Sequence, residues 1–480
     1  MTCRPSFYLM VVSMVLPVAT PTVARGQESG RDTVVGRAER RRFTSPTQSV
    51  SDDPRRVPEP PGVNGPSGTL VLRGGRIFDG TGAPVREGTL VITRNHIDRI
   101  LAPSATGWPS DARVIDVAGK TVMPGLIDLH THLTYPDDDT PGSVAGSRAD
   151  AALRGVERLR YYIESGITSI RDVGSEGDVP FRLQAWVKQN RVIGPRVFAA
   201  GQLITSKGGH GDDGGPYNST AGGMVRVASG PDDWREAVRE QFTAGADLIK
   251  IASHFTPAEV SAAIQEAHAL GLKVTCDCET FYTKWAVEAG IDMIEHPLPR
   301  SDETIALMKR HGTESDPTLT PYIIIFNSAG AYYGTTSRRF FFSKSVNFAL
   351  VKKMKDAGIT LGVGTDLVRD WFRYLPGPYI NELQQFVRLG YTVPEVLQIA
   401  TRTNAQMLDM GDRLGTLEPG KLADVTVIDG RPEVSLDDLA KVWLVVRDGY
   451  VVVDQGHITV PRHVPTAMPP ERLEEPQAQH

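Results

Sequence analysis

Residues 126–132 read LIDLHTH, an apolar run that ends in two histidines separated by one residue. A short apolar run of this kind predicts a buried β-strand. Alternate side chains of a strand point to the same face, so His130 and His132 share one face at its end. Two imidazoles placed in this way can bind one metal ion. The alternative is a pair of exposed histidines at a strand end.

Strand-like and helical stretches alternate between residues 124 and 410. The strand-like runs include GITSIRDVG, RVFAAGQLI, ADLIKIAS, LKVTCDC, IDMIEHP, GTESDPTL and ITLGVGTD. Residues 257–270 are typical of the predicted helices, because a proline stands in the first turn and Gly271 follows the last one. This alternation predicts an α/β fold, a (β/α)8 TIM barrel, in which chemistry lies at the carboxyl ends of the strands.

Short β-rich runs lie on both sides of this region, in residues 69–123 and 411–460. TLVLRGGRIFDGTG and KVWLVVRDGYVVVDQGHI are examples, and glycines separate the runs. We expect the two flanks to pair into one small β-sandwich subdomain.

The two ends of the chain differ in composition from the rest. Arg4, the apolar residues 7–18 and the small residues after them predict a signal peptide over residues 1–24, and therefore an exported, periplasmic or secreted protein. An uncleaved membrane anchor is the alternative, but the run is short for a bilayer, so we expect no stable membrane insertion after cleavage. Residues 25–68 and 461–480 have few large apolar side chains and predict a disordered linker and a disordered tail.

The overall composition excludes several classes of protein. The 480 residues include 52 Lys and Arg against 57 Asp and Glu, which gives a net charge of −5. This balance provides no broad cationic surface, so we expect no nucleic-acid partner. Three cysteines form no disulfide framework, whereas eleven histidines can supply ligands.

Three further polar residues lie in or after apolar runs. Lys250 lies within ADLIKIAS, where a buried ammonium group is costly unless it is paired, neutralised or modified. A strand-end carboxylate could pair with it, or carbon dioxide could convert it into a carbamate that bridges two cations. His296 follows IDMIE, and Asp366 follows TLGVGT. Each residue alone has a structural explanation, but their occurrence on successive strands favours a metal site.

Several segments resemble those of the amidohydrolase superfamily: VMPGLIDLHTHL, GADLIKI, EAGIDMIEHP, GVGTD and RLGTLEPGKLADVTVIDG. The likeness extends over residues 69–460. GGHGD, at residues 208–212, resembles a loop of the imidazolonepropionase-like and prolidase-like dipeptidase branch. The resemblance implies a divalent metal site, usually with two zinc ions. The implied ligands are His130, His132, the carboxylated bridging lysine Lys250, His296 and Asp366.

One position departs from the family pattern, because Asp277 stands where the fifth strand normally carries a histidine ligand. Three explanations stay open. Asp277 coordinates the metal itself, which would favour manganese or iron beside zinc; Glu279, on the same strand face, reaches in instead; or the second metal is lost. If Asp277 points inward, its neighbours Cys276 and Cys278 are expected to be buried apolar thiols rather than a Cys-x-Cys metal site.

The resemblance also implies roles in catalysis. Asp366 would accept the proton of the attacking water and pass it to the leaving amine. His210 would donate to the developing oxyanion and contact the substrate, unless it is an exposed loop histidine. Tyr322, Arg300 and Arg369 follow predicted strands, where an arginine could bind a substrate carboxylate and aromatic side chains could pack an apolar group. Alternatively, the aromatic side chains only pack the rim of the barrel and do not contact substrate.

The function predicted from these residues and this resemblance is hydrolysis of an amide bond, such as that of a dipeptide or an N-acyl amino acid. The expected partner is therefore a small-molecule amide or peptide substrate, and a homo-oligomer stays open. A cyclic amide, a lactone or a carbamate is the alternative substrate for a hydrolase. A second class stays open: an exported binding protein built on a degenerate barrel.

Overall fold

The computed structural model describes residues 65–137, 147–212, 223–328 and 343–459. The predicted signal peptide, most of the predicted linker and the predicted tail lie outside these residues. Within the described ranges, we find no helix that is both long enough and apolar enough to cross a membrane.

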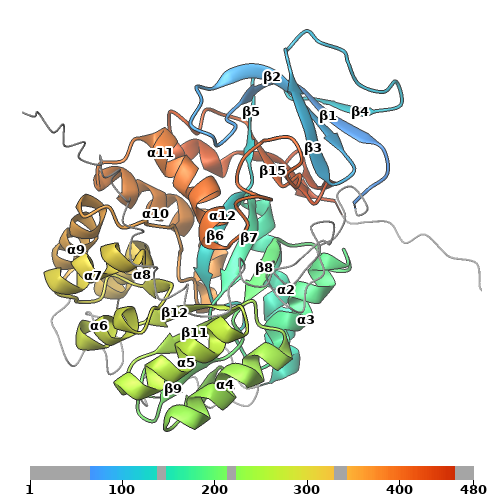
Figure 1. Cartoon of the computed structure of the whole chain (residues 1–480). Coiled ribbons are helices and arrows are strands. Elements are labelled where there is room, and N and C mark those ends of the chain that lie inside the picture. The colour runs from blue at the N-terminus through green and yellow to red at the C-terminus, as the bar shows by residue number, and fades with distance from the viewer. Residues whose placement is uncertain (1–64, 138–146, 213–222, 329–342, 460–480) are drawn as a thin grey trace, which may run out of the picture.

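Two sheets of parallel strands form the centre of the molecule (Figure 1). The six-stranded sheet has the order β10 (Val225–Ala228), β9 (Leu203–Ser206), β11 (Leu248–Ala252), β12 (Lys273–Asp277), β13 (Met293–Glu295) and β14 (Glu314–Asp316). The three-stranded sheet has the order β6 (Leu126–Thr131), β7 (Ile167–Asp172) and β8 (Arg196–Ala199). The α/β class predicted from the alternation of strands and helices is confirmed.

Residues 360–367 connect the two parallel sheets. On one side, Gly362 N donates to Ser315 O of β14 (2.9 Å). On the other side, Leu129 N of β6 donates to Val363 O (3.0 Å). Parallel backbone bridges follow at both sheets, at Ser315 with Leu361 and at Thr131 with Leu367. This segment therefore brings the end of β14 next to the end of β6.

Helices lie on the outside of these strands (Figure 1). They are α2 (Arg148–Glu164), α3 (Val179–Lys188), α4 (Pro231–Ala244), α5 (Pro257–Ala269), α6 (Thr280–Glu288), α7 (Asp302–His311), α8 (Leu319–Ser328), α9 (Lys344–Asp356), η3 (Arg369–Tyr374), α10 (Gly377–Arg388), α11 (Val393–Gln398), η4 (Ile399–Thr403), α12 (Asn404–Met407) and η5 (Leu436–Ala440). The helix predicted from its first-turn proline is α5, which begins with a capping box between Thr256 and Glu259.

A nine-stranded sheet contains segments from both flanks of the parallel strands. Its strands are β1 (Thr69–Ile77), β2 (Arg86–Thr93), β3 (His96–Leu101), β4 (Arg113–Asp116), β5 (Thr121–Pro124), β15 (Val425–Ile428), β16 (Val442–Arg447), β17 (Tyr450–Asp454) and β18 (His457–Ile458). The two flanks meet where β5 pairs antiparallel with β15. Leu72, Ile92, Val425 and Leu444 share one buried apolar cluster, so both flanks contribute to the same core.

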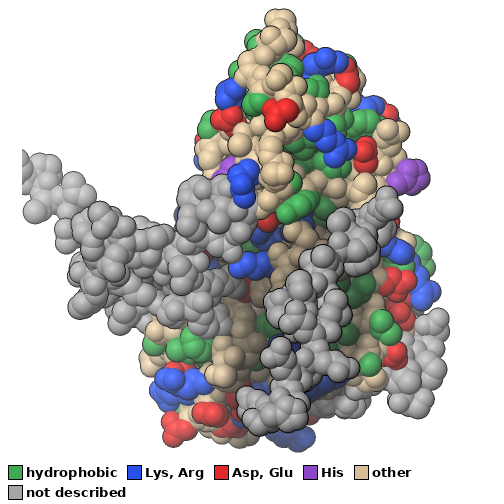
Figure 2. Space-filling model, turned by 90° about the vertical axis from the view of Figure 1, so that its right-hand side faces the viewer, with side chains coloured by type: hydrophobic (Ala, Val, Ile, Leu, Met, Phe, Trp, Pro, Cys, Tyr) green, Lys and Arg blue, Asp and Glu red, His purple; other side chains and the backbone are tan. Residues whose placement is uncertain are grey.

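Charged side chains on the surface are mixed in sign. On the face shown in Figure 2, Lys and Arg side chains alternate with Asp and Glu side chains over the described residues. This pattern agrees with the nearly balanced charge of the whole chain.

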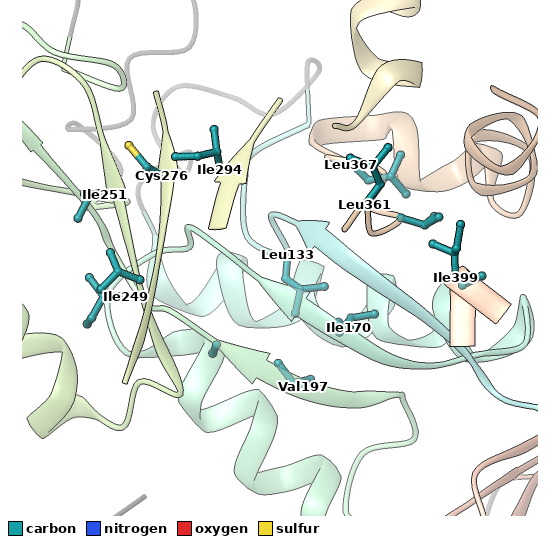
Figure 3. Packing of buried hydrophobic residues seen from close by; sticks show 14 of the residues in the cluster. Leu133, Ile170, Val197, Ile249, Ile251, Cys276, Ile294, Leu361, Leu367 and Ile399 are labelled. Carbon is teal, nitrogen blue, oxygen red and sulfur yellow. The ribbon is translucent and has the colours of Figure 1, made fainter. Parts of the chain in front are cut away.

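The main apolar core contains alternate residues of the central strands. Ile249 and Ile251 of β11, Cys276 of β12 and Ile294 of β13 all belong to it (Figure 3). Cys276 and Cys278 are fully buried and belong to this core, as expected from sequence.

The buried carboxyl group of Glu382 in α10 makes the stability of the fold depend on pH. Its buried carboxylate accepts hydrogen bonds from Leu319 N (2.8 Å) and Thr320 N (2.6 Å) at the start of α8, and burial raises its pKa to about 7. The folded chain keeps this proton to a higher pH than the unfolded chain, so Glu382 lowers stability as the pH rises from about 4.5 to 7. Relative to the wild type, Glu382→Gln should therefore gain on the order of 3 kcal/mol of unfolding free energy over this range. Urea unfolding at a series of pH values measures the difference, and a constant difference would contradict the assignment.

Candidate active site

The two histidines of the quoted motif meet the predicted aspartate at the ends of the strands. Asp366 N donates to His130 O (2.8 Å), which fixes the aspartate beside β6. Asp366 Oδ1 lies 3.2 Å from His132 Nε2 and 3.4 Å from His130 Nε2. All three residues are buried. The structure therefore brings together the first and last candidate ligands of the sequence.

Each candidate histidine is oriented by a hydrogen bond at its Nδ1 atom. His132 Nδ1 donates to Gly174 O (2.8 Å), and His130 Nδ1 donates to the carboxylate oxygen Oε2 of Glu295 (2.9 Å). His296 Nδ1 lies 2.8 Å from Thr318 Oγ1. Outer partners of this kind fix the ring and leave Nε2 for a metal ion.

Glu295 is itself held in place by two donors. Arg171 donates from Nη2 to its Oε1 atom (2.7 Å), and the Thr275 hydroxyl donates to the same oxygen. Glu295 lies directly before His296 at the end of β13. A carboxylate beside a candidate ligand in a buried strand was the available sequence signal for its role, but the sequence analysis assigned no role to it.

Lys250 of β11 points away from the apolar core. Its neighbours Ile249 and Ile251 belong to the core (Figure 3). Strand alternation therefore turns the lysine to the opposite face. The residue is only 2 % exposed. Its charge lowers the pKa of both His130 and Asp277, which places it at the site.

Asp277 of β12 lies between two imidazoles. Its Oδ2 atom is 3.3 Å from His210 Nε2 and 3.3 Å from His296 Nε2. Burial alone would raise the pKa of Asp277, but His210, His296 and then Lys250 hold it well below its usual range. The carboxylate is therefore charged and faces the candidate ligands.

Glu279 faces a different set of partners. Its Oε1 atom lies 3.2 Å from His254 Nε2, and its Oε2 atom accepts a hydrogen bond from the Ser253 hydroxyl. Of the two carboxylates that the sequence left open at this strand, Asp277 is the one in contact with the other candidate ligands.

Burial and neighbouring charges favour a neutral His130 and an ionised Asp366. Burial, followed by the charge of Lys250, lowers the pKa of His130 well below its usual value, so its imidazole is neutral at pH 7. Burial opposes ionisation of Asp366, but its contacts with His130 and His132 lower its pKa below the usual range. Neutral imidazoles and charged carboxylates are the forms that bind metal ions.

These residues fit a divalent cation. Candidate ligand atoms of His130, His296 and Asp366 all lie within 4.8 Å of one another. His130 Nε2 is buried and has no hydrogen-bond partner among the described residues, as expected for a nitrogen that awaits a metal ion. Atoms of His130, Glu295 and Asp316 are equally close. Arg171 already lies 2.7 Å from Glu295 and 3.5 Å from Asp316, so that second group has its own cation.

The residues expected to contact substrate lie around the same centre. The ring of Tyr322 is 5.8 Å from that of His296. Burial and then the charges of Asp277 and Asp366 raise its pKa well above the usual value. Arg369 lies near Tyr135, which stacks on His132 with ring centroids 4.7 Å apart.

Arg300 has a structural role instead of the substrate-binding role considered from sequence. Its side chain is buried and donates to Leu298 O (3.1 Å) and to His296 O (2.6 Å). Burial lowers its pKa to about 10. Its donors are therefore directed at the backbone that carries His296.

A parallel α/β fold with histidines and aspartates gathered at its strand ends defines the class of metal-dependent hydrolases. Residues 121–453 match the amidohydrolase family. The chain belongs to the amidohydrolase family, whose members are generally metal-dependent, and it is an amidohydrolase-type hydrolase of carbon–nitrogen bonds.

Three similar proteins were compared with this chain. It is 26 % identical to the ochratoxinase of Aspergillus niger over 407 residues, which cover 75 % of this chain and 81 % of that protein. It is 26 % identical to the imidazolonepropionase of Symbiobacterium thermophilum over 440 residues, which cover 82 % and 95 %. A crystal structure of a Xaa-Pro dipeptidase with bound methionine in the active site superposes with a TM-score of 0.71 at 26 % identity, covering 80 % and 99 %. The branch expected from sequence is confirmed.

Removing the Glu295 carboxylate should weaken metal binding. In Glu295→Ala, His130 loses the acceptor that orients its ring, and we expect the metal affinity to fall by about 10–100-fold. Glu295→Gln keeps an acceptor oxygen and should lose less. Competition with a coloured chelator measures the affinity. Glu259→Ala, which removes the buried carboxylate that caps α5, is the matched control and should bind metal normally.

Proposed function

We propose that this protein hydrolyses the amide bond of a small substrate, such as a dipeptide or an N-acyl amino acid. The observation that carries this proposal is the meeting of His130, His132 and Asp366 around a buried imidazole nitrogen without a hydrogen-bond partner among the described residues. The names of the related dipeptidase and imidazolonepropionase support the same reaction class.

The proposed centre holds two divalent ions, with zinc as the first choice and manganese or iron as alternatives. Its ligands are His130, His132, Asp277, His296, Asp366 and a carbamate formed on Lys250 by carbon dioxide. A carbamate supports a lysine buried on the face of β11 opposite the apolar core, because it replaces an ammonium group by an anion that the ions neutralise. The carboxylate of Asp277 favours the harder ions.

The proposed mechanism assigns proton transfer to Asp366. Bound ions would supply a water of lowered pKa and would polarise the substrate carbonyl. Asp366 accepts the proton of the attacking water and delivers it to the leaving nitrogen. Its ionised carboxylate and its position beside two histidines support this role. In the same scheme His210 donates to the oxyanion.

The substrate assignment rests on residues at the rim. Arg369 would bind a substrate carboxylate, and Tyr322 would contact the group next to the scissile bond. Both lie beside candidate ligands, Arg369 through Tyr135 and Tyr322 through His296. A cyclic amide, a lactone or a carbamate is the alternative substrate class. No nucleic-acid partner is proposed.

The finer architecture and the location of the protein belong to the same proposal. The two parallel sheets would close into one (β/α)8 barrel, which is supported by residues 360–367 on one side and by the bond from Asp247 N to Ala199 O (2.8 Å) on the other. The nine-stranded sheet would fold as a small β-sandwich. We keep residues 1–24 as a signal peptide, and we propose an exported protein without stable membrane insertion.

A substrate screen tests the function. Metal-loaded protein is offered dipeptides, N-acyl amino acids, cyclic amides, lactones and carbamates, and release of the amine or acid is followed. Turnover of a dipeptide or N-acyl amino acid supports the proposal. Turnover of a cyclic substrate alone selects the alternative, and a protein that binds no metal and turns over nothing would be a binding protein on a degenerate barrel.

Asp366→Asn should separate chemistry from metal binding. The amide keeps an oxygen ligand but cannot carry the proton, so we expect kcat to fall by about 10²–10⁴-fold while the metal content stays near that of the wild type. Steady-state kinetics and elemental analysis of the same preparation measure both. Unchanged turnover would refute the proton-transfer role.

Lys250→Met should reduce the metal content from two ions per chain toward one. Methionine fills a similar volume but forms no carbamate, so the bridging ligand is lost. Lys273→Met is the matched control, because this lysine lies on neighbouring β12 and pairs with Asp409 (2.8 Å) instead of facing the site. Two ions in both variants would argue against a carbamate at Lys250.

A further inference from the structure

His210, which follows β9, lies where it could replace the histidine that β12 lacks. Asp277 occupies the strand position, and its Oδ2 atom lies 3.3 Å from Nε2 of His210. His210 follows β9 and is separated from Asp277 by 66 residues of sequence, so neither spacing nor alternation relates the two.

We infer that His210 is a ligand of the metal ion that Asp277 binds, and that it supplies the imidazole missing from β12. This inference rests on the proposed metal centre. It replaces the oxyanion role above, because it makes His210 Nε2 a metal ligand before any substrate arrives.

The spacing of the two side chains fits a shared ion. Two atoms that each lie 2.0–2.1 Å from a tetrahedral zinc ion are about 3.3 Å apart. Asp277 Oδ2 has this separation from His210 Nε2, and it has the same separation from His296 Nε2. The carboxylate therefore lies between two imidazoles from different elements.

The backbone around His210 places this side chain firmly. His210 N donates to Ser253 O at the end of β11 (2.9 Å), and Ser253 N donates to Asp277 O (3.1 Å). Gly209 has no room for a side chain, because an added Cβ would lie 2.7 Å from Ser253 O and 2.9 Å from His254 N. The segment is thus packed directly against the strand end that adjoins Asp277.

His254 also lies near this strand end, but it contacts Glu279 instead of the candidate ligands. His254 Nε2 lies 3.2 Å from Glu279 Oε1, and its ring is 5.1 Å from that of Tyr282. Glu279 also accepts the Ser253 hydroxyl. His254 therefore serves as a matched control for the loss of an imidazole close to the site.

The charge of the site gives a reason for the exchange. Aspartate in place of a neutral histidine adds one negative charge and removes a nitrogen donor. His210 restores a nitrogen donor without adding charge, which keeps the mixed nitrogen and oxygen ligand set that suits zinc, manganese or iron.

A double-mutant cycle on full-length, metal-loaded protein tests the inference. The variants are His210→Ala, Asp277→His and the double variant, and the readouts are ions per chain, affinity by chelator competition and the visible absorption of the cobalt form. We expect His210→Ala to weaken binding of one ion by about tenfold or more. In the Asp277→His background, where the strand carries its own imidazole, the same change should cost less than about threefold.

The outcomes separate this inference from the proposed function. If His210→Ala keeps both ions at wild-type affinity and the wild-type cobalt spectrum, and changes only KM or kcat, His210 contacts substrate and the inference is wrong. If the wild type itself binds no ions, the proposed metal centre fails first. His254→Ala should leave metal binding unchanged; an equal loss in that variant would show a general disturbance and would also overturn the inference. If Asp277→His does not fold, comparison of the wild type with His210→Ala still decides.

Discussion

The buried carboxylate of Asp128 ties together the parts of the chain that carry the active site. Its Oδ1 atom accepts from His130 N (3.1 Å) and Thr365 N (3.0 Å), and Oδ2 accepts from the Thr365 and Tyr162 hydroxyls. One side chain thus joins β6, helix α2 and the residue before Asp366. Burial raises its pKa to about 6 although these donors favour the charged form, so they offset only part of the desolvation cost.

A second layer of contacts gives the site its orientation. A backbone carbonyl, a carboxylate and a threonine hydroxyl each meet the Nδ1 atom of one candidate histidine. They come from residues 174, 295 and 318, which follow or end different strands. Each histidine ring therefore has the orientation needed for metal binding only when its neighbouring strands are in register. The geometry of the site thus depends on the packing of the whole parallel assembly.

The sequence predicted the α/β class and the meeting of His130, His132 and Asp366, because strand alternation and the end of an apolar run determine where such side chains point. It did not predict that His210 would reach Asp277, since that contact depends on how a loop docks on β11. It left Arg300 as a substrate contact because an arginine after a strand has the same pattern whether it faces substrate or backbone. Glu295 was assigned no role because its partner His130 is 165 residues away.

The antiparallel pair of β5 and β15 has a consequence for how the chain can fold. It joins Thr121 to Ile428 and Pro124 to Val425, so its two halves are separated by almost the entire parallel assembly. During synthesis, β5 keeps an unpaired edge until β15 has been made. The catalytic segment is thus enclosed between two strands that meet only late. The sheet can therefore be completed only after the intervening chain has folded compactly enough to bring its own ends together.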